Sequence, residues 1–278
     1  MIPAATRMGP VHLTVSDLAR SLDFYRRAVG LDVLDEGGGR ASLGAGDDEL
    51  LVLFEDPDAR PSVGRTGLYH FALLLPERRA LASWLAHAAR ERVPLTGLSD
   101  HDVSEAIYLN DPDRHGIEIY ADRPREQWEG RVWERMTTMP LDVDSLLGEL
   151  GEQPLEAPFD RLPAGTTMGH VHFKVADVPA AIAFYRDLLG LDLMAQLGDQ
   201  AAFLSAGGYH HHVGANAWES RGAPPPEPGS AALRRATIVL PDAAARDDLA
   251  GRLEAVEETD EGPVVADPSG NRLLLATE

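Results

Sequence analysis

Four side chains able to do metal and acid–base chemistry lie within residues 67–120 of this sequence. They are His70, His101, Tyr108 and Glu118. Glu118 falls in the apolar alternation I-E-I-Y, where an unpaired buried carboxylate would be costly and a bound cation would compensate it. Two imidazoles, a phenol and a carboxylate in one small unit predict a metal site with acid–base chemistry. The elements around them must supply whatever ligand this unit lacks.

Composition limits the metals and the partners. The chain has 278 residues, a net charge of −20 and no cysteine. Strong acidity disfavours nucleic acid as a partner. Without cysteine, a metal must be held by His, Asp or Glu, which suits Fe(II), Mn, Ni or Zn. No apolar run is long enough to span a bilayer and the start lacks a signal-peptide pattern, so we expect a cytoplasmic protein with no membrane partner.

An internal repeat organises the chain. Residues 11–34 recur as residues 171–194, with the shared skeleton V-H-x-x-V-x-D, then F-Y-R, then G-L-D. Each copy predicts a strand, a helix capped by Asp17 or Asp177 and ended by Gly30 or Gly190, and further strands. These further strands are expected at residues 41–46, 49–56, 201–208 and 210–218.

A second, weaker repeat aligns residues 68–76 with 233–241, and the last strands 111–121 with 267–277. We therefore predict an α+β fold of four βαβββ units, at about residues 1–60, 61–122, 166–222 and 229–278. The first two units form one domain (1–122) and the last two form another (166–278).

Between the two predicted domains lies a helical and Pro-rich linker, residues 123–165. Trp128 and Trp133 are expected to be packing anchors of its helices. These helices pack either internally or against a second copy, so a homo-oligomer is left open.

Four βαβββ units with this V-H-x-x-V-x-D-L…F-Y…G-L-D opening resemble the vicinal oxygen chelate superfamily of glyoxalases, bleomycin-resistance proteins and extradiol dioxygenases. The runs GLYHFALLLP, ADRPR and SAGGYHHHVGANAW resemble its tandem catechol/hydroquinone extradiol ring-cleaving dioxygenase branch. The resemblance implies that paired units curl their sheets around a cleft. It also implies that metal ligands come from the first and last strands of each unit.

Two pairings of the units are open. If units pair in sequence, the ligands are His12, His70 and Glu118. If units two and three pair crosswise, the ligands are His70, Glu118 and His172, with His212 from a histidine run as a fourth. We favour the crosswise pairing, because units two and three both carry ligand types on both outer strands. Either set has the two histidines and one carboxylate of non-haem Fe(II) sites.

The family's extradiol signature is matched by His101, the dipeptide Ile107-Tyr108, the dipeptide Asp111-Pro112 and Glu118. The chain departs from it at Arg114-His115, where a Gly-Asn type of turn is usual. The resemblance implies that Fe(II) binds both oxygens of an aromatic diol and that O2 takes a remaining position. His101 would then act as a positioned base and acid, and Tyr108 would hydrogen-bond the ligated oxygen.

Three functions compete. The favoured one is an extradiol dioxygenase that cleaves a catechol- or hydroquinone-like ring with O2, using Fe(II) or, alternatively, Mn. The second is a glyoxalase-like lyase or isomerase with Ni or Zn, which a four-ligand site including His212 would suit better. The third is a ligand-binding protein of the bleomycin-resistance type, without a catalytic metal.

Overall fold

The computed structural model describes residues 1–152, 154 and 158–277. This part of the chain forms an eight-stranded sheet, a nine-stranded sheet and a two-stranded ribbon. The predicted α+β class with four βαβββ units is confirmed, because each unit places one helical segment after its first strand and three strands after that helix. None of the described helices is both long and apolar enough to cross a lipid bilayer.

Units one and four share the eight-stranded sheet, in the order β17-β18-β19-β16-β1-β4-β3-β2. Unit one consists of β1 (Arg7–Val15), α1 (Leu18–Phe24), η1 (Tyr25–Val29), β2 (Asp32–Gly37), β3 (Arg40–Ala45) and β4 (Asp48–Glu55). Unit four consists of β16 (Leu233–Leu240), α6 (Ala243–Ala250), β17 (Val256–Thr259), β18 (Gly262–Ala266) and β19 (Arg272–Thr277).

Units two and three share the nine-stranded sheet, in the order β10-β7-β8-β9-β6-β11-β14-β13-β12. Unit two consists of β6 (Gly67–Leu74), α2 (Arg78–Glu91), β7 (Leu95–Asp100), β8 (Ser104–Asn110) and β9 (Gly116–Asp122). Unit three consists of β11 (Thr167–Lys174), α5 (Val178–Ile182), η3 (Ala183–Leu188), β12 (Asp192–Leu197), β13 (Ala201–Ser205) and β14 (Val213–Asn216). Strand β10 (Met139–Pro140) lies at the edge.

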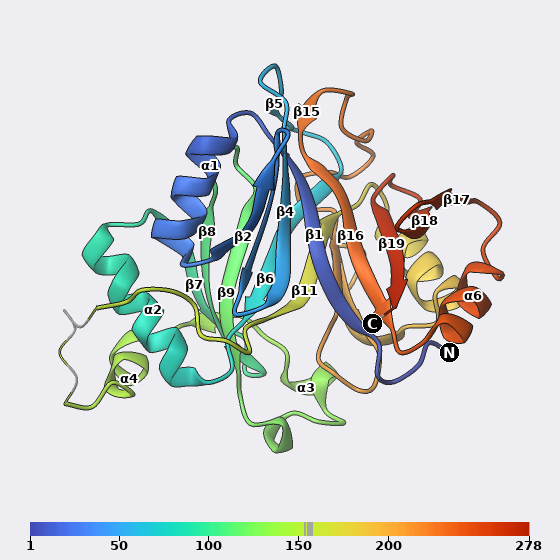
Figure 1. Ribbon diagram of the computed structural model, residues 1–278. Coiled ribbons are helices and arrows are strands. Elements are labelled where there is room, and N and C mark those ends of the chain that lie inside the picture. Colours follow the sequence, from blue (N-terminus) through green and yellow to red (C-terminus); the bar gives the residue numbers. More distant parts are fainter. Residues whose placement is uncertain (153, 155–157, 278) are drawn as a thin grey trace.

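The crosswise pairing of units is confirmed by these strand orders. Antiparallel β6 and β11 join units two and three, while antiparallel β1 and β16 join units one and four. Figure 1 shows β1 beside β16 at the centre of the molecule, with α1 and α2 on one side and α6 on the other. Each sheet thus draws one unit from each half of the sequence. The division into domains at 1–122 and 166–278 stays a prediction.

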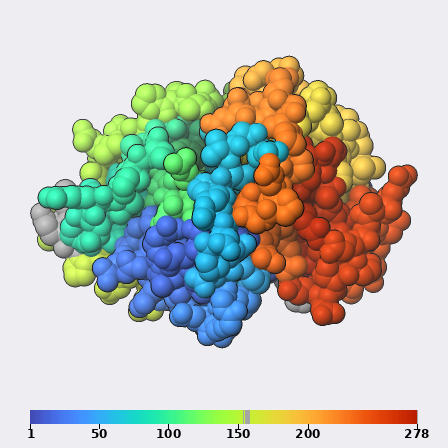
Figure 2. Space-filling view, turned by 90° about the horizontal axis from the view of Figure 1, so that it is seen from above, coloured from blue at the N-terminus to red at the C-terminus, as the bar shows by residue number. Residues whose placement is uncertain are grey.

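A small ribbon also links the two halves. Strands β5 (Arg60–Pro61) and β15 (Ser230–Ala231) pair in parallel. Figure 2, seen from above, shows the cyan segment around β5 lying against the orange segment around β15. The loops that follow units one and three are therefore held together by this short pairing.

The helix boundaries follow the repeated motifs. The side chains of Asp17 and Asp177 accept hydrogen bonds from backbone N–H groups three residues on, as N-caps do. Gly30 and Gly190 have φ values of 93° and 85°, a left-handed conformation that favours glycine. The predicted caps and stops are thus confirmed. Both helices end in π-helical turns, η1 and η3, which the sequence did not indicate.

The F-Y-R and D-P motifs stabilise the fold as matched pairs. The buried Tyr25 hydroxyl donates to Oδ2 of Asp111 at 3.0 Å, and the buried Tyr185 hydroxyl donates to Oδ2 of Asp267 at 3.0 Å. Each aspartate also accepts backbone N–H groups of the turn that it begins. The tyrosine of one unit therefore fixes the turn before the last strand of the next unit.

The linker is part of the nine-stranded assembly. It contains η2 (Arg125–Gln127), α3 (Val132–Arg135), β10 and α4 (Val143–Gly148), and β10 pairs with β7. Trp128 is buried as expected, whereas Trp133 is 58% exposed, so the prediction that Trp133 is a packing anchor is wrong. The expected Pro-rich tie lies partly outside the described residues, at 153 and 155–157.

Candidate metal centre and active site

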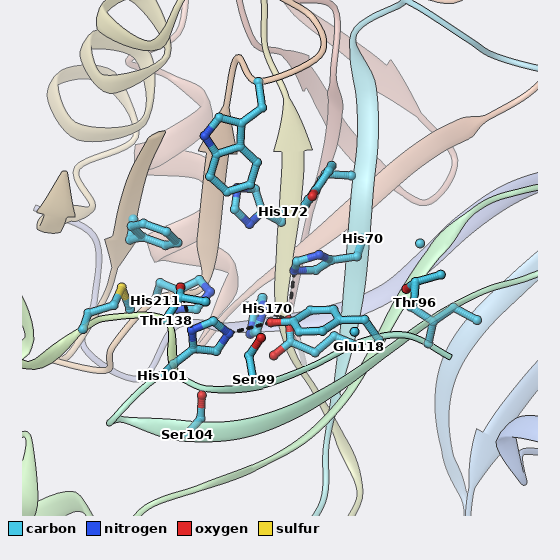
Figure 3. A pocket seen from close by; sticks show the side chains of 18 of the residues that line it. His70, Thr96, Ser99, His101, Ser104, Glu118, Thr138, His170, His172 and His211 are labelled. Atoms are coloured by element: carbon cyan, nitrogen blue, oxygen red, sulfur yellow. Dashed lines mark hydrogen bonds and ion pairs between the residues drawn. The ribbon is translucent and has the colours of Figure 1, made fainter. Parts of the chain in front are cut away.

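Three side chains from three neighbouring strands converge in the nine-stranded sheet. They are His70 on β6, Glu118 on β9 and His170 on β11, and one ligand atom of each lies within 4.8 Å of the others. Nε2 of His70 is 3.0 Å from Oε2 of Glu118, and Nε2 of His170 is 3.1 Å from the same oxygen. Figure 3 shows the three side chains pointing toward one another. All three are buried, so this is a shielded cluster with a single formal negative charge.

Glu118 and His170 each shift the pKa of the other. Burial alone would raise the pKa of Glu118, but the charge and hydrogen bonds of His170 and His70 hold that pKa well below its usual range. Burial lowers the pKa of His170 to about 4 despite the opposing effect of Glu118. An ionised carboxylate beside neutral imidazole nitrogens is the protonation state in which these residues bind a cation.

The cluster fits a divalent cation. Nε2 of His70 is buried and, although it lies 3.0 Å from Oε2 of Glu118, it is not aligned to form a hydrogen bond with that oxygen. Such unpartnered nitrogens are costly in a protein interior unless something else satisfies them. Two imidazoles and one carboxylate are the donor set of non-haem Fe(II) sites with open positions. His70, Glu118 and His170 therefore form the candidate metal centre.

His172, expected from the repeat as a ligand, lies beside this cluster but is not part of it. Its ring centroid is 5.0 Å from that of His70 and 5.7 Å from that of Trp218. Both His170 and His172 face the same side of β11, since they are two residues apart. The repeat aligned His172 with His12, whereas the residue that aligns with His170 is Pro10. His170 of the second copy therefore has no histidine counterpart in the first copy, so the alignment of the copies did not point to it.

The histidine run precedes β14 (Val213–Asn216), so the strand expected at residues 210–218 is shorter than predicted and does not include the histidines. His212 lies outside the cluster of ligand atoms. Its Nδ1 accepts the N–H of Ala206 at 3.2 Å and lies 3.0 Å from the hydroxyl of Ser205. His211 is the member that contacts the candidate centre, with its ring centroid 4.0 Å from that of His170.

A hydrogen-bonded chain supports His211. Nε2 of His210 lies 2.9 Å from Oδ1 of Asp122, and Nδ1 of His210 lies 2.7 Å from Nδ1 of His211. A carboxylate accepts, so it places a proton on Nε2 of His210. In that tautomer Nδ1 of His210 accepts from Nδ1–H of His211, which leaves Nε2 of His211 as an acceptor. Sequence reasoning missed this role, because it considered the histidine run only as the source of a fourth metal ligand, His212.

His101 and Tyr108 form a direct pair near the same cluster. Nδ1 of His101 lies 2.7 Å from the carbonyl oxygen of Thr137 and therefore donates to it. In that tautomer Nε2 of His101 accepts from the Tyr108 hydroxyl, 2.7 Å away. Burial, followed by the charge of Glu118, raises the pKa of Tyr108 well above 10. His101 and Tyr108 were expected to act at one site, and the structure places them in direct contact. The backbone carbonyl of the linker residue Thr137 orients His101.

A cavity of about 820 Å³ opens onto the candidate centre. His101, Tyr108, His172 and His211 line it together with the three cluster residues (Figure 3). Its walls include the aromatic side chains of Tyr69, Phe203 and Trp218 beside several aliphatic ones. The linker closes one side with Trp133, Met136 and the segment 137–138. The exposed Trp133 is thus part of the cavity wall.

The equivalent place in the other sheet cannot hold a cation in the same way. His12 pairs in register with Arg235, where unit two has His70. Burial, followed by Arg235, Arg40 and Arg234, lowers the pKa of His12 to about 3. Leu274 stands where unit two has Glu118, in accordance with the repeat. The two-fold repeat has therefore kept a ligand set in only one of its two sheets.

Comparison with known proteins places the chain in a family. The model of the Glyoxalase/Bleomycin resistance protein/Dioxygenase superfamily matches residues 7–119 and 167–275. The chain belongs to this superfamily. One relative is a catechol-2,3-dioxygenase of Bacillus subtilis (strain 168). The two sequences are 43% identical over 275 residues, which cover 95% of this chain and 94% of that protein. The resemblance to the superfamily noted in the sequence is confirmed.

Solved structures support the superfamily fold. Glyoxalase I from Zea mays matches with a TM-score of 0.59 and 16% identity, over 98% of this chain and 92% of that chain. The cppA protein from Streptococcus pneumoniae matches with a TM-score of 0.57 and 15% identity, over 98% of this chain and 97% of that chain. At such low identity these matches show a shared arrangement of the units.

Proposed function

We propose that the protein is a metal-dependent extradiol dioxygenase that cleaves a catechol- or hydroquinone-like ring with O2. The observation that carries this proposal is the buried cluster of His70, Glu118 and His170 at the wall of an aromatic cavity. The 43% identity to a protein named catechol-2,3-dioxygenase supports the same reaction class. The histidine from unit three is His170 in this proposal, in place of His172.

Fe(II) is the metal we propose, held by His70, Glu118 and His170. When bound, it supplies Lewis acidity toward the diol oxygens and the one-electron chemistry that O2 requires. His172 and His212 have no ligand role in this proposal. His172 instead lines the cavity, with its ring edge toward Tyr69 at a centroid distance of 5.3 Å.

The cavity walls position the ring of the substrate. Tyr69, Phe203 and Trp218 present aromatic surfaces, and aromatic rings prefer edge-to-face or offset contacts with one another. A diol held between these walls places its hydroxyl groups toward the buried cluster.

Two imidazoles flank the place where the diol oxygens would lie. The Tyr108 hydroxyl, held by His101, is a donor that can turn to a substrate oxygen, and His101 can then accept a proton from that oxygen. On the other side, His211 offers Nε2 as an acceptor, with its tautomer fixed by His210 and Asp122. Either imidazole can thus take a proton from the diol, while the Tyr108 hydroxyl is the group that holds a proton toward the substrate.

Anaerobic loading of the protein with Fe(II), followed by oxygenated catechol or hydroquinone, tests the proposal. We expect oxygen uptake matched by a yellow ring-cleavage product. A metal-free sample and a His170→Ala sample are the controls, and both should be inactive. Absence of oxygen uptake across a panel of diols, together with tight binding of Ni or Zn and isomerase activity, would refute the proposal in favour of a glyoxalase-like enzyme.

A further inference from the structure

The face of β11 that lines the cavity has a lysine, Lys174, at its last position. His170, His172 and Lys174 alternate along this strand, and all three line the cavity. Lys174 is the only lysine in the sequence, and the rest of its 25 Lys and Arg residues are arginines. An ammonium is a compact point charge on a slim stem, unlike the broad guanidinium fork. The single lysine of this chain thus stands where a narrow cation can reach into the substrate cavity.

Lys174 lacks a fixed partner. Its side chain is half-buried, and no ion pair joins its ammonium to a carboxylate in the described residues. Burial lowers the pKa of Lys174, and the field of the exposed Glu219 opposes that shift. A partly desolvated ammonium without a partner is unfavourable unless a ligand supplies the missing charge.

Arg114 brings a second cation to the same end of the cavity. It lies in the turn before β9, which runs parallel to β6, and Lys174 pairs in register with Gly67 at the start of β6. Arg114 has a φ of 70°, and the corresponding residue of the twin turn is Gly270 with a φ of 85°. A left-handed non-glycine residue at a cavity wall indicates a functional reason for its side chain. Arg114 is exposed and makes no ion pair in the described part of the chain.

We propose that this end of the cavity binds an anionic substituent, such as a carboxylate, carried by the diol ring. The inference rests on the proposed function of the site. Lys174 provides the charge-assisted hydrogen bond, and Arg114 adds long-range attraction at the entrance. The substrate class is therefore a dihydroxy-aromatic acid.

The distances along β11 suit such a substrate. His170 and Lys174 are separated by roughly 13 Å of extended strand, with His172 midway between them. Tyr69 and Trp218, whose ring centroids are 5.4 Å apart, contact the His172 ring between the two ends. An aromatic ring whose hydroxyl groups lie toward His170 thus directs its far substituent along the wall toward Lys174.

Anaerobic calorimetry on the Fe(II)-loaded protein tests this inference without turnover. The probes are 3,4-dihydroxyphenylacetate and 3,4-dihydroxybenzoate, each compared with its neutral amide. We expect the anion to bind at least about tenfold more tightly than its amide for one of the two tether lengths. Lys174→Met should reduce this ratio to near one, while Lys174→Arg should restore part of it.

Two further variants make the test specific. Glu219→Gln removes a carboxylate that competes for Lys174, so the ratio should rise. Arg114→Gly removes the second cation and relieves the backbone strain, so the ratio should fall while the thermal stability is kept. A ratio near one in the wild type, or a ratio unchanged in a folded Lys174→Met variant, would overturn the inference. Oxygen uptake with unsubstituted catechol reports on the proposed function separately.

Discussion

Nε2 of His170 lies 3.1 Å from Oε2 of Glu118, although the two residues are 52 positions apart and belong to different copies of the repeat. The contact exists because β6 pairs with β9 on one side and with β11 on the other. Glu118 therefore meets histidines from two units. A metal held here would connect the two halves of the chain through its ligands.

Metal content should depend on His170 far more than on His172. His170→Ala removes a proposed ligand and should weaken metal binding by at least about tenfold, the lower range seen even for residues that only support a ligand. His172→Ala should keep most of the metal, and His12→Ala, in the other sheet, is the matched control. Metal analysis after dialysis and competition with a chelator provide the measurement. Loss of metal in His172→Ala but not in His170→Ala would return the ligand role to His172.

Turnover should depend on the pair of His101 and Tyr108 without a loss of metal. His101→Ala removes the acceptor of the Tyr108 proton and should slow kcat by about 10²–10⁴-fold, as expected for a positioned acid or base. Tyr108→Phe removes the donor and should slow kcat in the same direction. Oxygen uptake and bound iron are measured on the same samples. An unchanged kcat in His101→Ala would leave His211 as the sole imidazole candidate for proton transfer.

Stability should respond equally to the two buried tyrosine–aspartate contacts. Tyr25→Phe leaves one oxygen of Asp111 without its phenol donor and should cost about 1–2 kcal/mol in the free energy of unfolding. Tyr185→Phe does the same to Asp267 and serves as its matched twin. Denaturant titration of the metal-free protein measures both. A negligible change in both variants would show that the turns do not need these hydroxyls.

His12, which lies in the eight-stranded sheet, should make the free energy of unfolding decrease at acid pH. Its pKa is 6.5 in an ordinary setting and about 3 when folded. Between these values the unfolded chain binds a proton that the folded chain does not bind, so stability falls as the pH falls below 6.5 and levels off below about 3.

For His12 alone, this loss between pH 6.5 and pH 5 should be about 1.5 kcal/mol. His12→Gln should remove that part of the loss, whatever constant offset the substitution adds. Unfolding free energies of wild type and variant at several pH values give the two slopes. Parallel slopes would mean that His12 is protonated in the folded protein as readily as in the unfolded chain.

The repeat made most of the fold predictable from the sequence. Two alignable copies indicated the first strand, the helix and the last strand of each unit, the Asp17 and Asp177 caps, and the turns that begin at Asp111 and Asp267. The crosswise assembly could be argued from the ligand types on the outer strands. The boundaries of β14 could not, because the apolar alternation begins only at Val213 and the preceding histidines belong to a bend.

The site was less predictable than the fold, because the alignment of the two copies that revealed the fold also drew attention to the wrong histidines. Alignment of the copies directs attention to residues that they share, such as His12 and His172. The histidine at the cluster is instead the one that lacks a partner in the first copy, His170. Its position two residues before His172, on the same face of one strand, was the available signal. Nothing in the sequence indicated the contact of Thr137 with His101. Thr137 makes it with its backbone carbonyl, a group that every residue has.

The crosswise strand pairing has a consequence for synthesis on the ribosome. When the first half of the chain has emerged, His70 and Glu118 are present but β6 still has an open edge where β11 will pair. Strand β1 likewise waits for β16, which lies near the C-terminus. Neither sheet can close before most of the chain has been translated. Metal capture at His70, Glu118 and His170 would then be a late event in the maturation of each molecule, and the nascent chain would need protection of two unpaired strand edges until that point.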